Sequence, residues 1–318
     1  MVQPVNEYDS YDGSKGNRED LASIIYDISP TETPVLSMAA QGTATATLHE
    51  WLTDALDSPD GSNARVEGED KDALSISTPT RLQNYCQISD KTIVMSGTQQ
   101  SVNAVDYNGD LSRQVARKAL ALKRDMETIL TGNQYQAAGD LSTARKLRAL
   151  EAWYPSANSD RGAGGAAGST TEGATDSTTG DLRAIRESML KNVVQLVWTV
   201  GGNSDAIVAG GVNKQRISGF AGNANRETEA TDGKLSAYID IYASDFGKVM
   251  KIIPNRFSRA RTVHVLDSEM LGVDYLRKFF QIPLAKTGDS DKRLVGAEYT
   301  LKVNNPSAHG VIADLSVT

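Results

Sequence analysis

The residue types that most often carry catalysis or bind metals are few and widely separated in this chain. The histidines are His49, His264 and His309, and the single cysteine is Cys86. No two of them have the spacing of a metal-binding motif, and one cysteine cannot form an intrachain disulfide. The sequence has neither a G-x-S-x-G nucleophile motif nor a G-x-x-x-x-G-K-[ST] phosphate loop. We expect no catalytic residue, metal or cofactor, and interpret His49 and His264 as structural or surface residues.

Two other patterns look like ligand sites, but their context argues against that interpretation. The run GAGGAA at 162–167 matches the dinucleotide-binding pattern G-x-G-x-x-A, yet it follows no strand and precedes no helix. Segment 53–72 carries seven acidic residues against Arg65 and Lys71. Their order departs from the calcium-loop pattern D-x-[DN]-x-[DN]-G. We interpret this segment as a solvated or partner-facing acidic loop.

Composition and charge set broad limits on the class of protein. The chain has 318 residues, 39% hydrophobic and 23% charged, which is ordinary for a soluble globular protein with a sizeable core. A net charge of −7 argues against a general nucleic-acid-binding protein, although local basic patches remain. No apolar signal core begins the chain, and the longest apolar run, VVQLVWTV, is too short to span a membrane. These features predict a soluble cytoplasmic product without membrane contact.

The elements that would position these residues begin with segments that cannot form a core alone. Residues 1–20 are polar and predict an extended arm, and the spacing of apolar residues in 20–28 predicts a helix. Pro30 and Pro34 disfavour helical backbone in the residues before them, so 29–36 is predicted to be an extended strap. Such a strap needs another surface on which to lie.

Alternating apolar and polar residues then predict a long β-hairpin around the acidic loop. Its strands are ATATLHEW and ALSISTPTRLQNYCQIS, at 44–51 and 73–89. A long hairpin alone is only marginally stable in water, so it also needs a partner surface.

The strongest helical pattern spans residues 111–131. One face carries Leu111, Val115, Ala119, Leu122, Met126 and Ile129. Arg113, Arg117 and Arg124 lie on the opposite face, which is either solvated or in contact with a neighbouring subunit or packaged nucleic acid. Further along, residues 248–261 carry several basic residues and no acidic one.

The remaining sequence predicts a compact mixed unit. The Gly-rich stretch 155–180 is expected to be a flexible loop or linker, and 181–200 a helix that ends at Gly201. Strands are predicted within 205–211 and 236–266, with a loop and a helical turn over 267–280. Two closing strands, RLVGAEYTLKV and HGVIADLSV, complete an α+β chain.

The order of these elements resembles the Hong Kong 97-like fold of tailed-phage major capsid proteins. REDLASIIYDISPTETPVLSM followed by ATATLHEWLTDAL resembles the opening of a family of phage major head proteins. RQVARKALALKRDMETILTGNQ resembles the spine helix of that family, and LAKTGDSDKRLVGAEYTLKVNNPSAHGVIADL its C-terminal return. The resemblance covers nearly the whole chain and is weakest in the Gly-rich stretch.

The resemblance implies a division of the chain and a function. The implied parts are an N-terminal arm (1–41), an extended loop (42–88), a peripheral domain (89–135 and 286–318) with spine helix 111–131, and an axial domain (136–285) including the Gly-rich insertion 155–180. The implied function is that of a major capsid protein, not an enzyme. It would assemble into hexamers and pentamers of an icosahedral head enclosing double-stranded DNA, after synthesis in the host bacterial cytoplasm.

The implied partners are copies of the chain itself, scaffolding, portal and decoration proteins, and packaged DNA bound non-specifically. Because the arm begins close to Met1, we expect any scaffold to be a separate protein. Candidate intersubunit contacts are Pro30, Glu32, Pro34, Trp51, Asp54, Asp57, Asp60, Arg65, Glu67, Glu69 and Asp70. Candidate basic-interface or DNA-facing residues are Arg113, Arg117, Arg124, Arg256, Arg259 and Arg261. The alternatives are another self-assembling phage protein, such as a tail tube or surface lattice, and an enzyme of unidentified chemistry.

Overall fold

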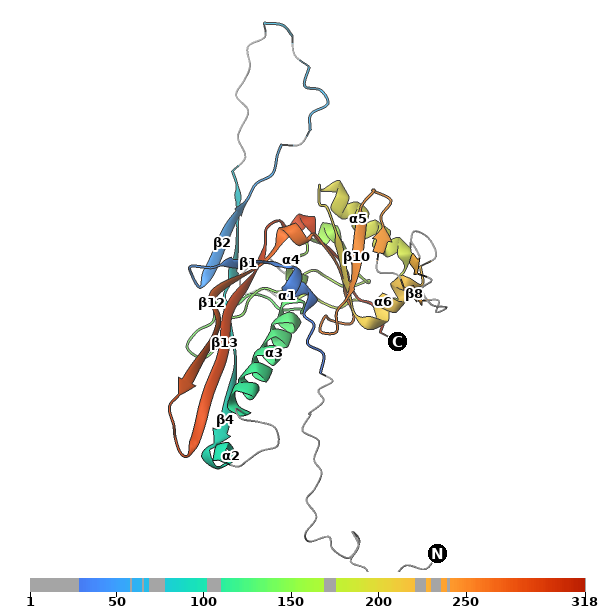
Figure 1. Ribbon diagram of the computed structural model, residues 1–318. Coiled ribbons are helices and arrows are strands. Elements are labelled where there is room, and N and C mark those ends of the chain that lie inside the picture. Colours follow the sequence, from blue (N-terminus) through green and yellow to red (C-terminus); the bar gives the residue numbers. More distant parts are fainter. Residues whose placement is uncertain are drawn as a thin grey trace, which may run out of the picture.

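The fold is organised around two β-sheets, from which a hairpin projects (Figure 1). The computed structural model describes residues 29–57, 59–64, 66–68, 78–101, 110–168, 176–220, 227–229, 236–238 and 241–317. The arm over residues 1–20 and the helix expected at 20–28 lie outside the described residues.

The first sheet has four strands in the order β1-β12-β13-β4. The strands are β1 (Ala40–Thr43), β12 (Leu271–Leu284), β13 (Ser290–Val303) and β4 (Gln87–Ser96). β1 runs parallel to β12, whereas β13 is antiparallel to both β12 and β4. β12 and β13 form a long hairpin, and β4 pairs with β13 as far as Ser290, close to the hairpin turn (Figure 1).

Helix α3 (Asp110–Leu130) packs along this sheet and confirms the helix predicted at 111–131. Leu122, Met126 and Leu130 on its apolar face are fully buried. The rest of the predicted apolar face is partly buried against the same core. The side-chain periodicity therefore identified the buried side of the helix correctly.

The second sheet has six strands in the order β5-β14-β11-β6-β10-β9. They are β5 (Ser159–Asp160), β14 (Gly310–Ile312), β11 (Val263–Leu266), β6 (Ala206–Ala209), β10 (Val249–Pro254) and β9 (Ile241–Ala243). Helices α5 (Glu187–Thr199) and α6 (Gly211–Ser218) pack on it and build a second apolar core. The smaller elements are α1 (Pro34–Met38), α2 (Gly97–Ser101), α4 (Leu150–Trp153), a pair β7 (Glu227–Glu229) and β8 (Ser236–Tyr238), and three short 3-10 turns.

Residues 267–280, expected to be a loop with a helical turn, are largely strand. The turn exists at Ser268–Met270, but β12 then begins at Leu271. Irregular pairing between Tyr275, Arg277 and Phe280 interrupts the alternation of side chains that identifies a strand in sequence. β12 also places residues 271–284 in the four-stranded sheet, whereas the expected axial segment extended to 285.

The C-terminal return divides between the two sheets instead of lying wholly in the peripheral part. β13 belongs to the four-stranded sheet, and β14 lies between β5 and β11 in the six-stranded sheet. The strand expected at 44–51 begins later than expected, because residues 44–47 connect β1, which ends at Thr43, to the hairpin strand β2 (Leu48–Thr53).

The Gly-rich stretch 155–180 is more ordered than a linker where it is described. Its β5 pairs in parallel with β14, and Gly162 is buried. A Cβ on Gly162 would lie 2.1 Å from the carbonyl oxygen of Asp181. The Gly162 amide donates to the Asp314 carboxylate at 3.0 Å. These glycines therefore permit close backbone contact, and the prediction of a flexible linker was wrong for this part.

Candidate interaction surfaces

The predicted acidic hairpin exists and is exposed. β2 pairs with β3 (Thr80–Tyr85) from Leu48↔Tyr85 to Thr53↔Thr80, and the chain beyond these strands projects from the body (Figure 1). Its described acidic side chains, Asp54, Asp57, Asp60 and Glu67, are all exposed. Arg65, Glu69 and Asp70 lie outside the described residues.

Apolar side chains on this hairpin are exposed as well. Leu56 is 98% and Val66 75% exposed, in a segment whose described residues beyond Thr53 are all exposed. An apolar surface of this kind is stabilised when another molecule covers it. The hairpin therefore has the character of a contact surface and not of a catalytic loop.

Trp51, a predicted intersubunit contact, joins the hairpin to its own chain, and its role toward a neighbour stays a prediction. Its indole Nε1 donates to the carbonyl oxygen of Val303 at 3.0 Å, and its ring centroid lies 5.5 Å from that of Trp153. The guanidinium of buried Arg148 lies 3.9 Å above the Trp153 ring. Burial lowers the pKa of Arg148 to about 10. The position of Trp51 in the sequence of the hairpin did not indicate that its side chain packs inward.

We expect Trp51→Ala to lower the free energy of unfolding of the subunit by about 2–4 kcal/mol, because it removes a large ring and leaves a carbonyl unpaired. Trp51→Phe should lose roughly 1 kcal/mol, since the ring contact with Trp153 is largely retained. Urea denaturation of the unassembled subunit measures both. Equal small losses would show that Trp51 contributes little to its own chain.

The arm contains a short helix where an extended strap was predicted. Pro34 occupies the first turn of α1, where a missing N–H is tolerated. Thr33 before it is non-helical, with φ −127° and ψ 78°, as its position before proline requires. Val35 and Leu36 are buried in the core of their own chain. The extended part is therefore confined to residues 29–33, in which Pro30 is half-buried and Glu32 exposed.

A buried carboxylate on the spine helix holds α1 in place. Glu127 Oε1 accepts from the Val35 amide at 2.9 Å and from Asn255 Nδ2 at 2.6 Å, and Oε2 accepts from the Leu36 amide at 2.8 Å. Glu127 thus joins the arm, α3 and the turn after β10. Burial raises the pKa of Glu127, and the hydrogen bonds from Leu36, Val35 and Asn255 act in the opposite direction. Sequence reasoning did not single out this residue.

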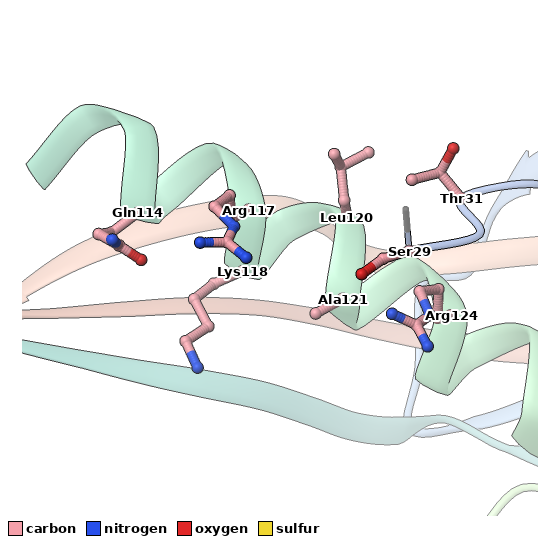
Figure 2. Close-up of a pocket in the computed structure, with 8 residues that line it drawn as sticks. All are labelled: Ser29, Thr31, Gln114, Arg117, Lys118, Leu120, Ala121 and Arg124. Carbon is pink, nitrogen blue, oxygen red and sulfur yellow. The ribbon is translucent and has the colours of Figure 1, made fainter. Parts of the chain in front are cut away.

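Two of the three predicted basic residues of α3, Arg117 and Arg124, border a groove beside the arm (Figure 2). Its volume is about 260 Å³, and Arg117, Lys118 and Arg124 line it together with Ser29 and Thr31. The Arg124 guanidinium lies 5.2 Å from the centre of the Phe257 ring. Arg113 is half-buried and is not among the lining residues.

In the second basic group, Arg256, Arg259 and Arg261, one residue has an ion pair within the subunit. Arg259 Nη1 lies 2.7 Å from the carboxylate of Glu151, which is fully buried, and Nη2 donates to Thr179 at 3.1 Å. Its charge is therefore paired inside the subunit, and its role at an interface stays a prediction. Arg256 and Arg261 are exposed.

Of the residues that first suggested chemistry, Cys86, His264 and His309 are buried and His49 is half-buried. Burial raises the pKa of Cys86 to about 11, so its thiol stays protonated at neutral pH. His264 Nδ1 lies 2.9 Å from the Tyr154 hydroxyl, and His309 Nδ1 accepts from the Asp267 amide at 3.2 Å. His49 Nε2 lies 2.8 Å from the Asp274 carboxylate. Within the described ranges there is no cluster of metal-ligating side chains and no helix able to span a membrane.

Comparison with known proteins agrees with a structural role. The sequence model of the SU10 major capsid protein family matches residues 7–316. The major capsid protein of Escherichia phage Phieco32 is 26% identical over 339 aligned residues, with 95% of each chain covered.

Solved structures share the fold at low sequence identity. A chain of Mycobacterium phage Bobi is 12% identical, with TM-score 0.62 and coverage of 98% of this chain and 100% of that one. A chain of Gordonia phage Cozz is 11% identical, with TM-score 0.61 and coverage of 100% and 99%. The SrpI encapsulin of Synechococcus elongatus PCC 7942 is 12% identical, with TM-score 0.59 and coverage of 99% and 98%.

These likenesses establish an α+β Hong Kong 97-like fold, which phage capsids and an encapsulin share. The fold alone does not identify the role of the protein. The family match does, because it spans nearly the whole chain. The chain therefore belongs to the SU10 major capsid protein family, and it is a self-associating structural component of a tailed-phage virion, not an enzyme.

Proposed function

We propose that the chain forms the hexamers and pentamers of an icosahedral head that encloses double-stranded DNA. The observation that carries the proposal is the projecting hairpin, whose acidic and apolar side chains have no cover from the described part of their own chain. Contacts repeated around closed symmetry axes turn modest pairwise energies into a durable shell. Family membership supports the proposal, because capsid proteins associate with copies of themselves.

The parts of the subunit take the following roles in this proposal. The four-stranded sheet with α3 forms the peripheral unit, and the six-stranded sheet forms the axial unit around the hexamer and pentamer centres. Residues 1–41 form the arm, and residues 42–88 form the extended loop that reaches a neighbour. Pro30 and Glu32 remain candidate contacts on the exposed part of the arm.

The proposed partners follow from the same role. The chain is made in the host bacterial cytoplasm, assembles with scaffolding and portal proteins, and accepts decoration proteins on the finished shell. DNA is held non-specifically, through phosphate contacts with basic side chains such as Arg256 and Arg261.

Replacement of residues 54–79 by Asn-Gly tests the proposal. A two-residue turn suits antiparallel strands, and Thr53 already pairs with Thr80, so β2 and β3 should stay joined. We expect a folded subunit with an unchanged melting temperature that forms no shells, while the full chain forms closed shells with fivefold and sixfold clusters in electron micrographs. Tubes from the full chain, or normal shells from the shortened chain, would contradict the proposal.

A further inference from the structure

The side of α3 that faces the arm brings together positive charge from separate elements. Lys123 of α3 and Lys278 of β12 line a groove of about 250 Å³. Arg124 of α3 lines the groove shown in Figure 2. Arm residues line both grooves, so the arm crosses α3 between them. The three cations therefore lie on the two sides of the arm.

A fourth cation, Arg256, lies in the turn after β10. Asn255 precedes it and donates from Nδ2 to Glu127 of α3 at 2.6 Å. Phe257 follows it, and the centre of this ring lies 5.2 Å from the Arg124 guanidinium. Both neighbours of Arg256 in the sequence thus hold the turn against α3. We define the basic face as Lys123, Arg124, Arg256 and Lys278.

The basic face presents its charge to solvent. Three of its side chains are exposed, those of Lys123, Arg256 and Lys278. None of the described residues that line the two grooves is acidic. The nearby carboxylates of α3 are directed elsewhere, because Asp125 pairs with Lys91 at 2.5 Å and Glu127 accepts from the arm amides. The one acidic residue of the described arm segment 29–38 is Glu32, so the excess charge here is positive.

The chain as a whole repels a polyanion, and the basic face is an exception. The net charge is −7, and the acidic hairpin projects away from α3 (Figure 1). Duplex DNA carries one negative charge per roughly 1.7 Å of its axis, and Lys and Arg neutralise its phosphates without reading its sequence. Lysine is depleted at protein–protein interfaces. Exposed lysines from two elements therefore favour DNA over a second subunit as the partner of this face.

We infer that the basic face contacts the phosphate backbone of packaged double-stranded DNA. The inference rests on the proposed function and names the surface that meets the DNA. It adds Lys123 and Lys278, which sequence reasoning did not single out. The contact is with phosphates, so it is independent of base sequence and weakens as salt rises. A shell repeats the same four cations in every subunit, so contacts that are weak singly add up along the packaged DNA.

Binding of a mixed-sequence DNA duplex to the unassembled full chain tests the inference. Fluorescence anisotropy measures the affinity at salt concentrations from about 50 to 200 mM, with the protein too dilute to form shells. The triple variant Lys123→Gln, Arg256→Gln and Lys278→Gln removes three phosphate contacts. We expect it to bind at least about tenfold more weakly at the lowest salt, and to reduce the slope of log affinity against log salt by about 2–3. A duplex of unrelated sequence should give the same values.

The matched control changes three exposed basic residues of the six-stranded-sheet unit, Arg186→Gln, Lys248→Gln and Lys251→Gln. It makes the same change in net charge and should leave the affinity within about twofold of the unchanged chain. The conservative variant Lys123→Arg and Lys278→Arg should also retain binding, because both charges remain. If the triple variant does not fold, the single variants Lys123→Gln and Lys278→Gln replace it, and each should lower the slope by about 1.

Closed shells assembled without DNA show on which side of the shell the basic face lies. A face that meets packaged DNA is enclosed, so an added duplex should bind the unassembled chain and not the closed shells. Closed shells that bind the duplex as tightly as the unassembled chain would overturn the inference, because the basic face would then lie outside.

The outcomes separate this inference from the proposed function. A loss of affinity in the triple variant and not in the control supports the inference. Equal affinities of these two variants, or no binding of the duplex by the unchanged chain, overturn it. A triple variant that binds the duplex normally and forms no shells overturns it in favour of a contact between subunits. In each of these cases shells from the unchanged chain leave the proposed function standing, whereas failure of that chain to form shells counts against the proposed function itself.

Discussion

Replacement of Glu127 by alanine is expected to lower the free energy of unfolding of the subunit by about 3–5 kcal/mol. The carboxylate accepts hydrogen bonds from two arm amides and from Asn255, and all of these groups are buried. Its removal leaves three hydrogen-bond donors unpaired where water has little access. Desolvated donors without an acceptor raise the free energy of the folded state. Because Val35 and Leu36 carry two of them, the arm should separate from α3 before the rest of the subunit unfolds.

Hydrogen exchange at the Val35 and Leu36 amides, together with urea denaturation, measures this effect. Glu127→Gln should lose about 2 kcal/mol, because its oxygen replaces one acceptor while its amide NH₂ faces a second donor. Asp125→Ala is the matched control on the same helix. Its partly exposed pair with Lys91 should contribute no more than about 1 kcal/mol. Unchanged protection of the arm amides in Glu127→Ala would show that α1 is held by its apolar contacts alone.

Acid is expected to destabilise the subunit through His264 and His309. Burial lowers the pKa of each from 6.5 to about 4. Between these values the unfolded chain binds a proton that the folded chain does not, so stability falls as the pH falls from about 6.5 toward 4. Each histidine should contribute a loss of about 3 kcal/mol over this window. Near His264, Glu151 raises the pKa and Arg259 lowers it, but both effects are smaller than that of burial.

The double variant His264→Asn and His309→Asn isolates this contribution. An asparagine amide can hydrogen-bond the Tyr154 hydroxyl in either direction, and its carbonyl can replace His309 Nδ1 as acceptor from the Asp267 amide, while neither side chain titrates. Urea midpoints at pH 7 and pH 4.5 should differ much less in the double variant than in the unchanged chain. If the urea midpoint changes equally with pH in the double variant and in the unchanged chain, the acid sensitivity comes from carboxylates and not from these histidines.

Periodic patterns over long segments allowed accurate prediction of the projecting hairpin and of the long helix α3. The face of α3 that is buried and the hairpin around an acidic loop both follow from the spacing of apolar residues. The same reasoning failed for β12, because its bulges interrupt the alternation, and for β5, because glycine composition resembles that of a linker. Local patterns carry no information on what a segment meets in space.

The predicted contact residues show the same limit. Trp51 lies in a hairpin that reaches outward, yet its indole bonds to Val303, more than two hundred residues away. Arg259 looks like part of a basic run, yet it neutralises buried Glu151. Glu127 is one acid in a charged helix, and only the fold brings the arm amides to it. Each of these roles depends on a partner residue that is distant in the sequence. The amino-acid sequence alone does not show which distant residues come into contact.

The position of β14 has a consequence for biosynthesis. This strand, at Gly310–Ile312, lies between β5 and β11, so β5 cannot join the six-stranded sheet before residues 310–312 have been made. β1 likewise waits for β12, which is made some two hundred residues later. A nascent chain shorter than about 300 residues therefore completes neither sheet. Polymerisation should begin only after these late strands have been made, which keeps half-made subunits from entering a growing shell.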